Sequence, residues 1–192
     1  MSVFTNPANS TAEETATYVS SLLGLLGDRD PVAVLAETPA EIERLLATVP
    51  AAAVTTPEAP GKWSIREVVQ HLADSELVGG WRLRLVLAQD RPALTGYDQD
   101  LWASRLRYDE VDVGDAFDQF AALRKANLRL WRGLTPDDLS RVGLHSERGE
   151  ESLAHLRKLY AAHDLLHRRQ LARIRAAVGG SAFGGTRPTP GT

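Results

Sequence analysis

Residues 153–178 read LAHLRKLYAAHDLLHRRQLARIRAAV, and this stretch decides the fold that we predict for the chain. Its apolar side chains recur at helical spacing, which predicts one long amphipathic helix. His163 and His167 lie one turn apart on the apolar face, and Gln170 follows at the next turn. Buried imidazole nitrogens need partners, and one divalent ion would satisfy both rings. Two ligands do not complete a coordination shell, so we expect a third elsewhere in the chain.

The composition is that of a soluble protein with one core. The chain has 192 residues, of which 43% are hydrophobic and 24% charged, so we predict a single domain over residues 1–178. The net charge of -3 and the absence of a long basic run argue against nucleic acid as a partner. No apolar run reaches the roughly 20 residues of a membrane span, so we expect a cytoplasmic protein without membrane association. Residues 179–192, rich in Gly, Pro and Thr, predict a disordered tail.

The absence of cysteine narrows the kind of metal site that the chain can build. Without thiolates there is neither a disulfide framework nor a cysteine-ligated zinc site. Any metal must then be held by carboxylates and by the chain's five histidines.

Helical periodicity covers most of the chain before residue 153. The first part predicts a peripheral helix over residues 11–26, a short helix over 31–36, a capped helix over 38–49 and an extended connection over 50–62. The second part predicts a capped helix over 64–89, a loop over 91–100, a short helix over 101–106, a long helix over 115–133, a short turn after Thr135, and a polar loop over 141–150 that could form a small hairpin. Gly79 and Gly80 inside the helix over 64–89 indicate a kink or a close helix approach.

Together these elements predict an all-α protein, a four-helix bundle with an extra N-terminal helical segment over residues 1–50 and no sheet of three or more strands. Metal sites in bundles are built from inward side chains of facing helices. His71 lies on the helix over 64–89, and Asp74, Ser75 and Arg82 continue a polar seam along its side. His71 is therefore the natural third ligand.

The segments that carry this pattern resemble the DinB-like superfamily and, within it, the YfiT-like metal-dependent hydrolases, also described as bacillithiol S-transferases. The resemblance covers roughly residues 59–177 and rests on GKWS at 61–64, EVVQHLADS at 67–75, Arg82, Tyr97-Asp98, Trp102, HSERGE at 145–150 and YAAHDLLHRRQL at 160–171. It implies a homodimer of four-helix bundles, each with a nickel or zinc ion on three histidines. The implied ligands are His71, His163 and His167. The segment before Pro50 matches the family poorly.

Several of these residues have a structural alternative. A single histidine on an apolar face is often a core residue bonded to a carbonyl, so His71 gains its metal-ligand interpretation from the His163 and His167 pair. His155 is expected to be solvated or capping, whereas His145 could line the entrance to the site. Arg82 could pair with an acidic residue across the bundle or bind substrate. The side chains of Trp63, Trp102 and Trp131 are expected in the core or in a pocket wall.

The function that we predict is that of a metal-dependent enzyme with a small-molecule substrate. Three neutral imidazoles leave coordination positions open, and the ion would activate water for hydrolysis or a low-molecular-weight thiol for S-transfer. Asp74 and Asp164 could orient imidazoles, and Tyr97 and Arg82 could hold an anionic group, so the predicted catalytic residues are Asp74, Tyr97 and Arg82. Because the ligands must be neutral, the metal should leave as the pH falls below about 6 to 7. The alternative is a non-catalytic, metal-stabilised helical module that binds a ligand or a protein partner.

Overall fold

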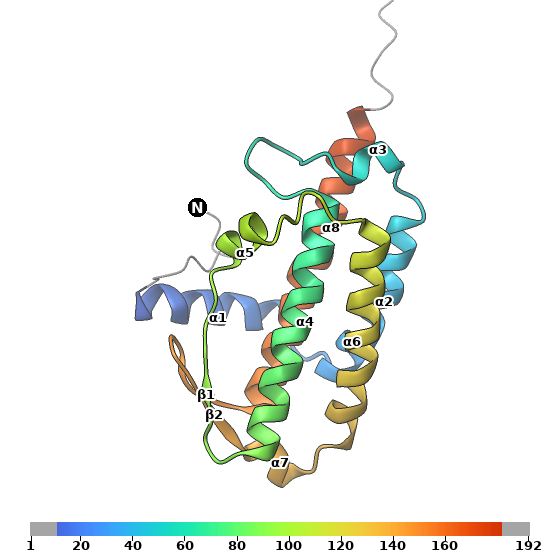
Figure 1. Cartoon of the computed structure of the whole chain (residues 1–192). Coiled ribbons are helices and arrows are strands. Elements are labelled where there is room, and N and C mark those ends of the chain that lie inside the picture. The colour runs from blue at the N-terminus through green and yellow to red at the C-terminus, as the bar shows by residue number, and fades with distance from the viewer. Residues whose placement is uncertain (1–10, 182–192) are drawn as a thin grey trace, which may run out of the picture.

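Four long helices form the body of the molecule in the structure, a computed structural model that describes residues 11–181 (Figure 1). They are α2 (Pro31–Leu46), α4 (Ile65–Ala88), α6 (Val113–Gly133) and α8 (Leu153–Ser181). Helices α2 and α4 each pack against both α6 and α8, so α2 and α4 occupy opposite corners of the bundle, as do α6 and α8. The predicted all-α four-helix bundle is confirmed, with α2 diagonal to α4 and α6 diagonal to α8.

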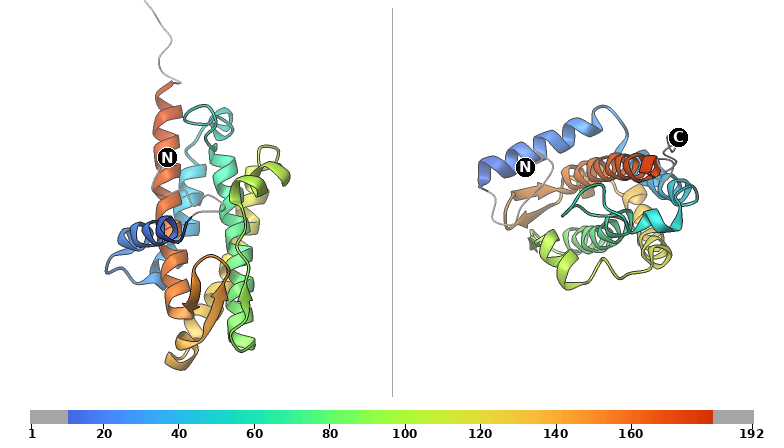
Figure 2. Two further views of the ribbon diagram at one scale, coloured as in Figure 1. Left: turned by 90° about the vertical axis from the view of Figure 1, so that its left-hand side faces the viewer. Right: turned by 90° about the horizontal axis from the view of Figure 1, so that it is seen from above.

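Helix α1 (Ala12–Leu26) lies across the outside of this bundle against α8, as Figures 1 and 2 show. Thr11 begins it with a capping box, because its hydroxyl accepts from the backbone of Glu14 while the Glu14 carboxylate accepts from the backbone of Thr11. Gly27, at a φ of 55°, ends it in a conformation that favours glycine. The predicted peripheral helix over residues 11–26 therefore has its expected place and bounds.

Helix α2 corrects the prediction of two separate helices over residues 31–36 and 38–49, because the chain continues as one helix through Pro39. A proline inside a helix removes the hydrogen bond to the carbonyl four residues earlier, which here is that of Leu35. Arg124 of α6 donates to this carbonyl at 2.7 Å, so the group that Pro39 leaves unpaired is satisfied across the bundle. The predicted extended connection over 50–62 is also interrupted, by the short helix α3 (Ala51–Val54).

A small sheet lies at one end of the bundle, so the prediction of no sheet of three or more strands is wrong. Its strands are β1 (Ala93–Leu94), β2 (Val142–His145) and β3 (Gly149–Ser152), in the order β1-β2-β3. The pair β2 and β3 is the antiparallel hairpin that the polar loop over 141–150 suggested, with Gly149 at a φ of 75°. Strand β1 pairs with β2 in parallel through only two residues, which is too short for any alternation of apolar and polar side chains to indicate a strand.

The remaining elements are short, and α8 is longer than expected. Helices α5 (Gln99–Arg105) and α7 (Pro136–Ser140) lie close to their predicted positions. Helix α4 begins at the predicted capping box of Ser64 and Glu67. Helix α8 runs three residues beyond the predicted end at Val178, and the rest of the expected tail, 182–192, lies outside the described residues. No helix within residues 11–181 is both long and apolar enough to cross a membrane.

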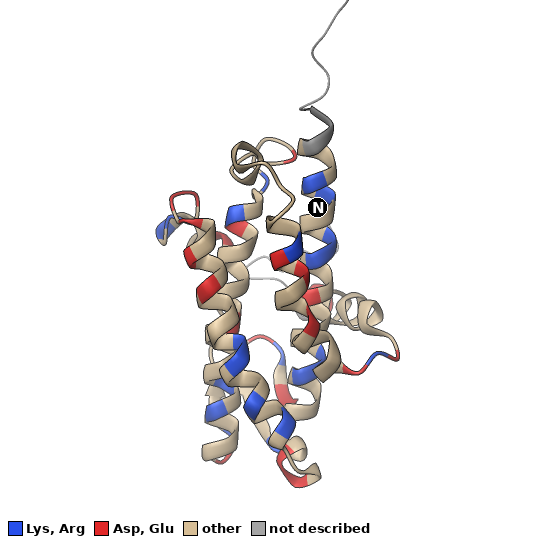
Figure 3. Ribbon diagram, turned by 90° about the vertical axis from the view of Figure 1, so that its right-hand side faces the viewer, with Lys and Arg blue, Asp and Glu red and all other residues tan. Residues whose placement is uncertain are grey.

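The core consists of two apolar clusters separated by a polar layer. One cluster includes Leu35, Leu83, Trp131 and Leu156, and the other includes Ile42, Val68, Phe120 and Ile174, so each long helix contributes to both. Between them each helix carries buried or half-buried polar side chains, which we call the polar layer: Thr38, His71, Asp74, Glu76, Arg124, Asn127, His163, Asp164 and His167. On the outer helix faces in Figure 3, acidic and basic residues are interspersed.

Candidate metal centre

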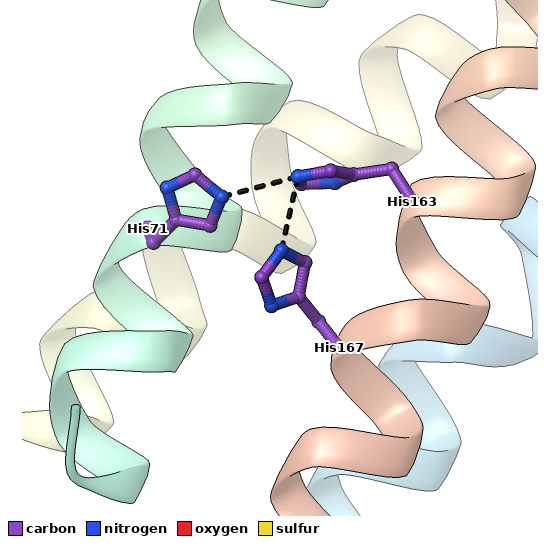
Figure 4. A group of neighbouring side chains, drawn as sticks. All are labelled: His71, His163 and His167. Atoms are coloured by element: carbon purple, nitrogen blue, oxygen red, sulfur yellow. Dashed lines mark hydrogen bonds between the residues drawn. The ribbon is translucent and has the colours of Figure 1, made fainter. Parts of the chain in front are cut away.

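Three histidines of the polar layer come together between α4 and α8 (Figure 4). The Nε2 atom of His163 lies 3.1 Å from Nε2 of His71 and 3.0 Å from Nε2 of His167. All three nitrogens lie within 4.8 Å of one another. One long helix thus supplies two imidazoles a turn apart, and the facing helix supplies the third at the same level.

A local contact fixes the protonation of one ring, and burial encloses another. Nδ1 of His167 lies 2.7 Å from Oε1 of Gln170, and an amide oxygen can only accept, so the ring proton sits on Nδ1 and the Nε2 lone pair is free. His71 is 1% exposed, and its Nδ1 has no hydrogen-bond partner among the residues that the structure describes. The Trp63 ring covers the His71 imidazole at a centroid distance of 4.9 Å.

Burial keeps the three imidazoles neutral. It lowers the pKa of His71 and of His163 well below the usual 6.5, and repulsion from His167 lowers both further. Burial also lowers the pKa of His167 to about 4, against the opposing effects of Gln170 and Asp164. Neutral imidazole is the form that binds a metal ion, so the site is in its ligand state throughout the neutral pH range.

This arrangement fits a divalent ion. Three nitrogen lone pairs that point at one another repel unless a proton or a cation lies between them, and burial disfavours the proton. The three histidines are the only group of potential metal ligands that the described part of the chain brings together. An all-imidazole donor set suits zinc, nickel and similar ions, and three ligands leave positions for water or substrate.

A pocket leads from the histidines to the surface. It encloses about 740 Å³ of empty space, including its open mouth. Its walls come from α1, α4, the segment between β1 and α5, the start of α5, the β2–β3 hairpin and α8. The lining residues are Tyr18, Val19, Leu22, His71, Ser75, Arg82, Gly96, Tyr97, Gln99, His145, Glu147, Arg148, Leu156, Leu159, Tyr160 and His163. Two of the three histidines therefore face the space in which a small molecule would bind.

The structure brings Arg82 and Tyr97 into this pocket. Arg82 is 6% exposed, and its guanidinium donates to the Tyr160 hydroxyl at 3.3 Å and to the Thr95 carbonyl at 2.5 Å. None of the ion pairs formed within residues 11–181 involves Arg82, so the expected acidic partner across the bundle is not found. The Tyr97 ring packs on Trp102 at 4.4 Å, and burial raises its pKa, with Tyr160 adding to the effect.

The two aspartates expected near the imidazoles have other partners. Asp74 accepts from the Tyr108 hydroxyl at 2.6 Å and from the Gln70 amide at 3.3 Å. Asp164 accepts twice from the Arg124 guanidinium, at 2.5 and 3.0 Å. Gln170, which the sequence placed on the ligand face without a role, makes the contact with an imidazole. Sequence reasoning missed this contact and that of Tyr160, although both residues lie three positions from a histidine on the same helix face.

The other two histidines lie away from the three-histidine group. His145 is 4% exposed and lines the pocket from β2, where its Nδ1 accepts from the Glu147 amide at 3.1 Å. The structure thus places its side chain, buried, in the wall of the pocket. His155 is partly exposed, and its Nε2 lies 3.9 Å from the Glu151 carboxylate.

Three known proteins are similar to this chain along much of its length. A protein of Oceanobacillus iheyensis named "putative metal-dependent hydrolase" is 33% identical over 107 residues, which cover 56% of this chain and 62% of that protein. A protein of Bacillus mycoides with a name of the same kind is 28% identical over 159 residues, which cover 83% of this chain and 91% of that protein. The solved structure of YfiT from Bacillus subtilis, described as "a probable metal-dependent hydrolase with an unusual four-helix bundle topology", matches with a TM-score of 0.67 at 25% identity, over 88% of this chain and 92% of that one.

A family model described as the DinB superfamily matches residues 35–171. The matched range begins inside α2, ends inside α8 and contains His71, His163 and His167. Helix α1, which supplies one wall of the pocket, lies before it. The resemblance found in the sequence is confirmed: this chain belongs to the DinB superfamily.

Proposed function

We propose that this protein is a metal-dependent enzyme that acts on a small molecule and holds its ion on His71, His163 and His167. The observation that carries the proposal is the convergence of three neutral imidazole nitrogens, 3.0 and 3.1 Å apart, at the inner end of a pocket. The names of the relatives, putative and probable metal-dependent hydrolases, agree with it.

The protein's residues hold the ligands in the reactive form and exclude water from their outer sides. Gln170 keeps the His167 proton on Nδ1, and Trp63 covers His71. A divalent ion, for which we propose nickel or zinc, supplies Lewis acidity that lowers the pKa of a bound water or thiol. Arg82 and Tyr97 line the pocket beyond the histidines and orient the substrate, whereas Asp74 acts through Tyr108 as a positioning residue.

Within this class we propose two reactions, hydrolysis by water and S-transfer from a low-molecular-weight thiol of the bacillithiol type to an electrophile. In the transfer, a sulfur–carbon bond forms, the leaving group departs with its electron pair, and the thiol proton passes to solvent. The test is incubation of nickel- or zinc-loaded protein with a panel of such thiols and 1-chloro-2,4-dinitrobenzene, whose thioether product absorbs in the near-ultraviolet. Metal-free protein and His167→Ala are the controls, and equal rates in all three would contradict S-transfer.

The alternative is a non-catalytic module whose ion only joins α4 to α8. The visible spectrum of cobalt-substituted protein distinguishes the enzyme from the non-catalytic module, because added thiol or imidazole changes the spectrum only where a coordination position is open. We expect a change that saturates. An unchanged spectrum at millimolar thiol would support the structural role.

We also propose that the protein is a cytoplasmic homodimer. Leu77 and Trp81, 48% and 61% exposed, lie one turn apart on the outer face of α4 and give a second copy an apolar surface to cover. Sedimentation at micromolar concentration tests this, and a monomer throughout would exclude the dimer.

A further inference from the structure

Two buried hydrogen-bond donors without acceptors lie in the wall of the pocket. The Nε atom of Arg82 and the Nε2 atom of His145 have no hydrogen-bond partner in the described part of the chain. Their residues are only 6% and 4% exposed, and both line the same cavity. Unsatisfied buried donors are costly, about 1–3 kcal/mol each, and are rare in native proteins unless a ligand, an ion or water completes them.

The tautomer of His145 follows from its one hydrogen bond. Its Nδ1 accepts from the backbone N–H of Glu147, so that nitrogen carries a lone pair. Burial, together with the nearby charges of Arg148 and Arg82, lowers the pKa of His145 to about 4 against the opposing effect of Glu151, so the ring is neutral. The single ring proton therefore sits on Nε2, which makes this atom a donor.

The electrostatics of the wall leave one positive charge without a partner. Arg148, the other cation that lines the pocket, donates twice to the Glu151 carboxylate, at 2.6 and 2.9 Å, and is neutralised by it. Arg82 bonds only to neutral oxygens, those of Tyr160 and Thr95. Glu147 also lines the pocket, but it is exposed and makes no ion pair within residues 11–181. A buried guanidinium without a counter-ion favours binding of an anion.

We propose that Arg82 and His145 form a subsite for a carboxylate group of the substrate. One uncompensated positive charge and one neutral donor match a monoanion with two acceptor oxygens better than they match a phosphate dianion. The Tyr160 hydroxyl that Arg82 contacts belongs to α8, where Tyr160 precedes His163 by three residues, a rise of roughly 4.5 Å. This inference rests on the proposed function, because it assigns the carboxylate to a molecule whose reacting group lies at the three histidines.

The subsite is tested on metal-free, full-length protein, so that the probe cannot bind through an ion. The probes are butyrate and butyramide, which have the same shape but differ in charge, together with inorganic phosphate. Nitrogen-15 NMR of the histidine rings follows His145 directly. We expect butyrate to shift the Nε2 resonance of His145 in a saturable manner, and butyramide and phosphate to bind at least tenfold more weakly. Equal affinity for butyrate and butyramide would overturn the proposal, and tighter binding of phosphate would overturn the choice of a carboxylate.

Variants test whether butyrate binds at Arg82 and His145. Arg82→Gln and His145→Phe should each weaken butyrate binding at least tenfold, while Arg129→Gln, which removes an exposed charge of α6, should leave it unchanged. Butyrate should also raise the melting temperature of the wild type but not that of Arg82→Gln. If Arg82→Gln does not fold, His145→Phe decides, and wild-type affinity in that variant would refute the subsite. Metal stoichiometry is measured separately, so loss of the metal site and loss of the carboxylate subsite give different results.

Discussion

His71 is the residue that connects the two halves of the candidate metal centre. It is the only one of the three histidines on α4, and its nearly complete burial leaves the imidazole no alternative position in water. His163 and His167 share α8 and would stay one turn apart without it. The third ligand is therefore also the only contact through which an ion can join the two helices.

We expect His71→Ala to lower metal affinity roughly a hundredfold or more, because binding free energies of about 10–16 kcal/mol are shared among three or four ligands. His145→Ala should keep full metal content, since His145 lies outside the three-histidine group. The measurement is metal stoichiometry after dialysis, with circular dichroism as a check on folding. Full retention of metal in His71→Ala would exclude the three-histidine site.

The depressed histidine pKa values predict an acid-sensitive stability for the metal-free protein. His145 and His167 have pKa values of about 4 in the folded state, against 6.5 for exposed histidine. Above pH 6.5 these histidines are neutral in both the folded and the unfolded state, so they do not affect stability. Below pH 6.5 they bind protons in the unfolded chain but not in the folded chain, so stability falls until about pH 4. Each such histidine contributes up to about 1.4 kcal/mol per pH unit. Urea unfolding between pH 7 and 4 measures the slope, and a flat profile would contradict it.

Because of the same burial, we expect metal release at a lower pH than the value of about 6 to 7 expected from the sequence. Protons compete for the imidazoles only near their folded-state pKa values, and that of His167 is about 4 rather than 6 to 7. The pairing of His163 with His167 could be predicted from helical spacing, because positions four apart must share a face, and His71 from its place on a facing helix of the bundle. The protonation of these histidines could not be predicted, and neither could the choice of Gln170 over Asp164 as the partner of an imidazole. Both depend on side chains that meet only in the folded protein.

At the scale of the elements, α4 depends on two glycines that allow its neighbours to approach. A Cβ atom at Gly79 would lie 2.6 Å from the Tyr160 ring of α8, and one at Gly80 would overlap the Asn127 side chain of α6. Asn127 cannot turn away freely, because its amide donates to the backbone carbonyl and to the carboxylate of Glu76, at 3.1 and 2.8 Å. The close helix approach that the glycine pair indicated is thus present on both sides of α4.

We expect Gly80→Ala to destabilise the protein by roughly 1–3 kcal/mol, because the overlap outweighs the better helix propensity of alanine. Gly24→Ala is the matched control. Gly24 also lies inside a helix, but a Cβ atom added there would have no neighbour within 4 Å, so the substitution should stabilise by about 0.5–1 kcal/mol. Urea unfolding of the two variants gives the sign of each change in the free energy of unfolding. A gain in stability for Gly80→Ala would show that α6 can move to accommodate the added methyl group.

The errors of prediction at this scale share one cause. Helices that are capped and periodic, such as α4 and α8, were found within a few residues of their bounds, because their signals are local. The break expected before Pro39 does not occur, because Arg124 satisfies the Leu35 carbonyl. Arg124 lies 89 positions after Leu35 in the sequence. Strand β1 likewise exists only because β2 lies beside it: the amides of Leu144 and Ser146 donate to the carbonyls of Pro92 and Leu94. Long-range partners of this kind leave no pattern in the sequence.

At the scale of the whole molecule, the polar layer joins all four long helices. Arg124 of α6 donates to the Leu35 carbonyl of α2 and pairs with Asp164 of α8 and Glu76 of α4, the latter at 2.8 Å. Burial alone would lower the pKa of Arg124, but the two carboxylates raise it, so the guanidinium stays charged. Because Asp164 neighbours His163 in sequence, we expect this network also to set the rotation of α8 that turns both of its histidines toward α4.

Removing one member of this network should therefore cost more than any surface change. We expect Arg124→Met to lower the free energy of unfolding by about 3–5 kcal/mol, because two buried carboxylates and a carbonyl lose their partner. Arg129→Met, an exposed arginine of the same helix, should change it by no more than about 0.5 kcal/mol. The combination Glu76→Leu, Arg124→Met, Asp164→Leu removes the buried charges together and should recover part of the loss. If the network sets the rotation of α8, the recovered triple variant still binds metal more weakly than the wild type, whereas wild-type metal affinity would show that packing alone orients the histidines.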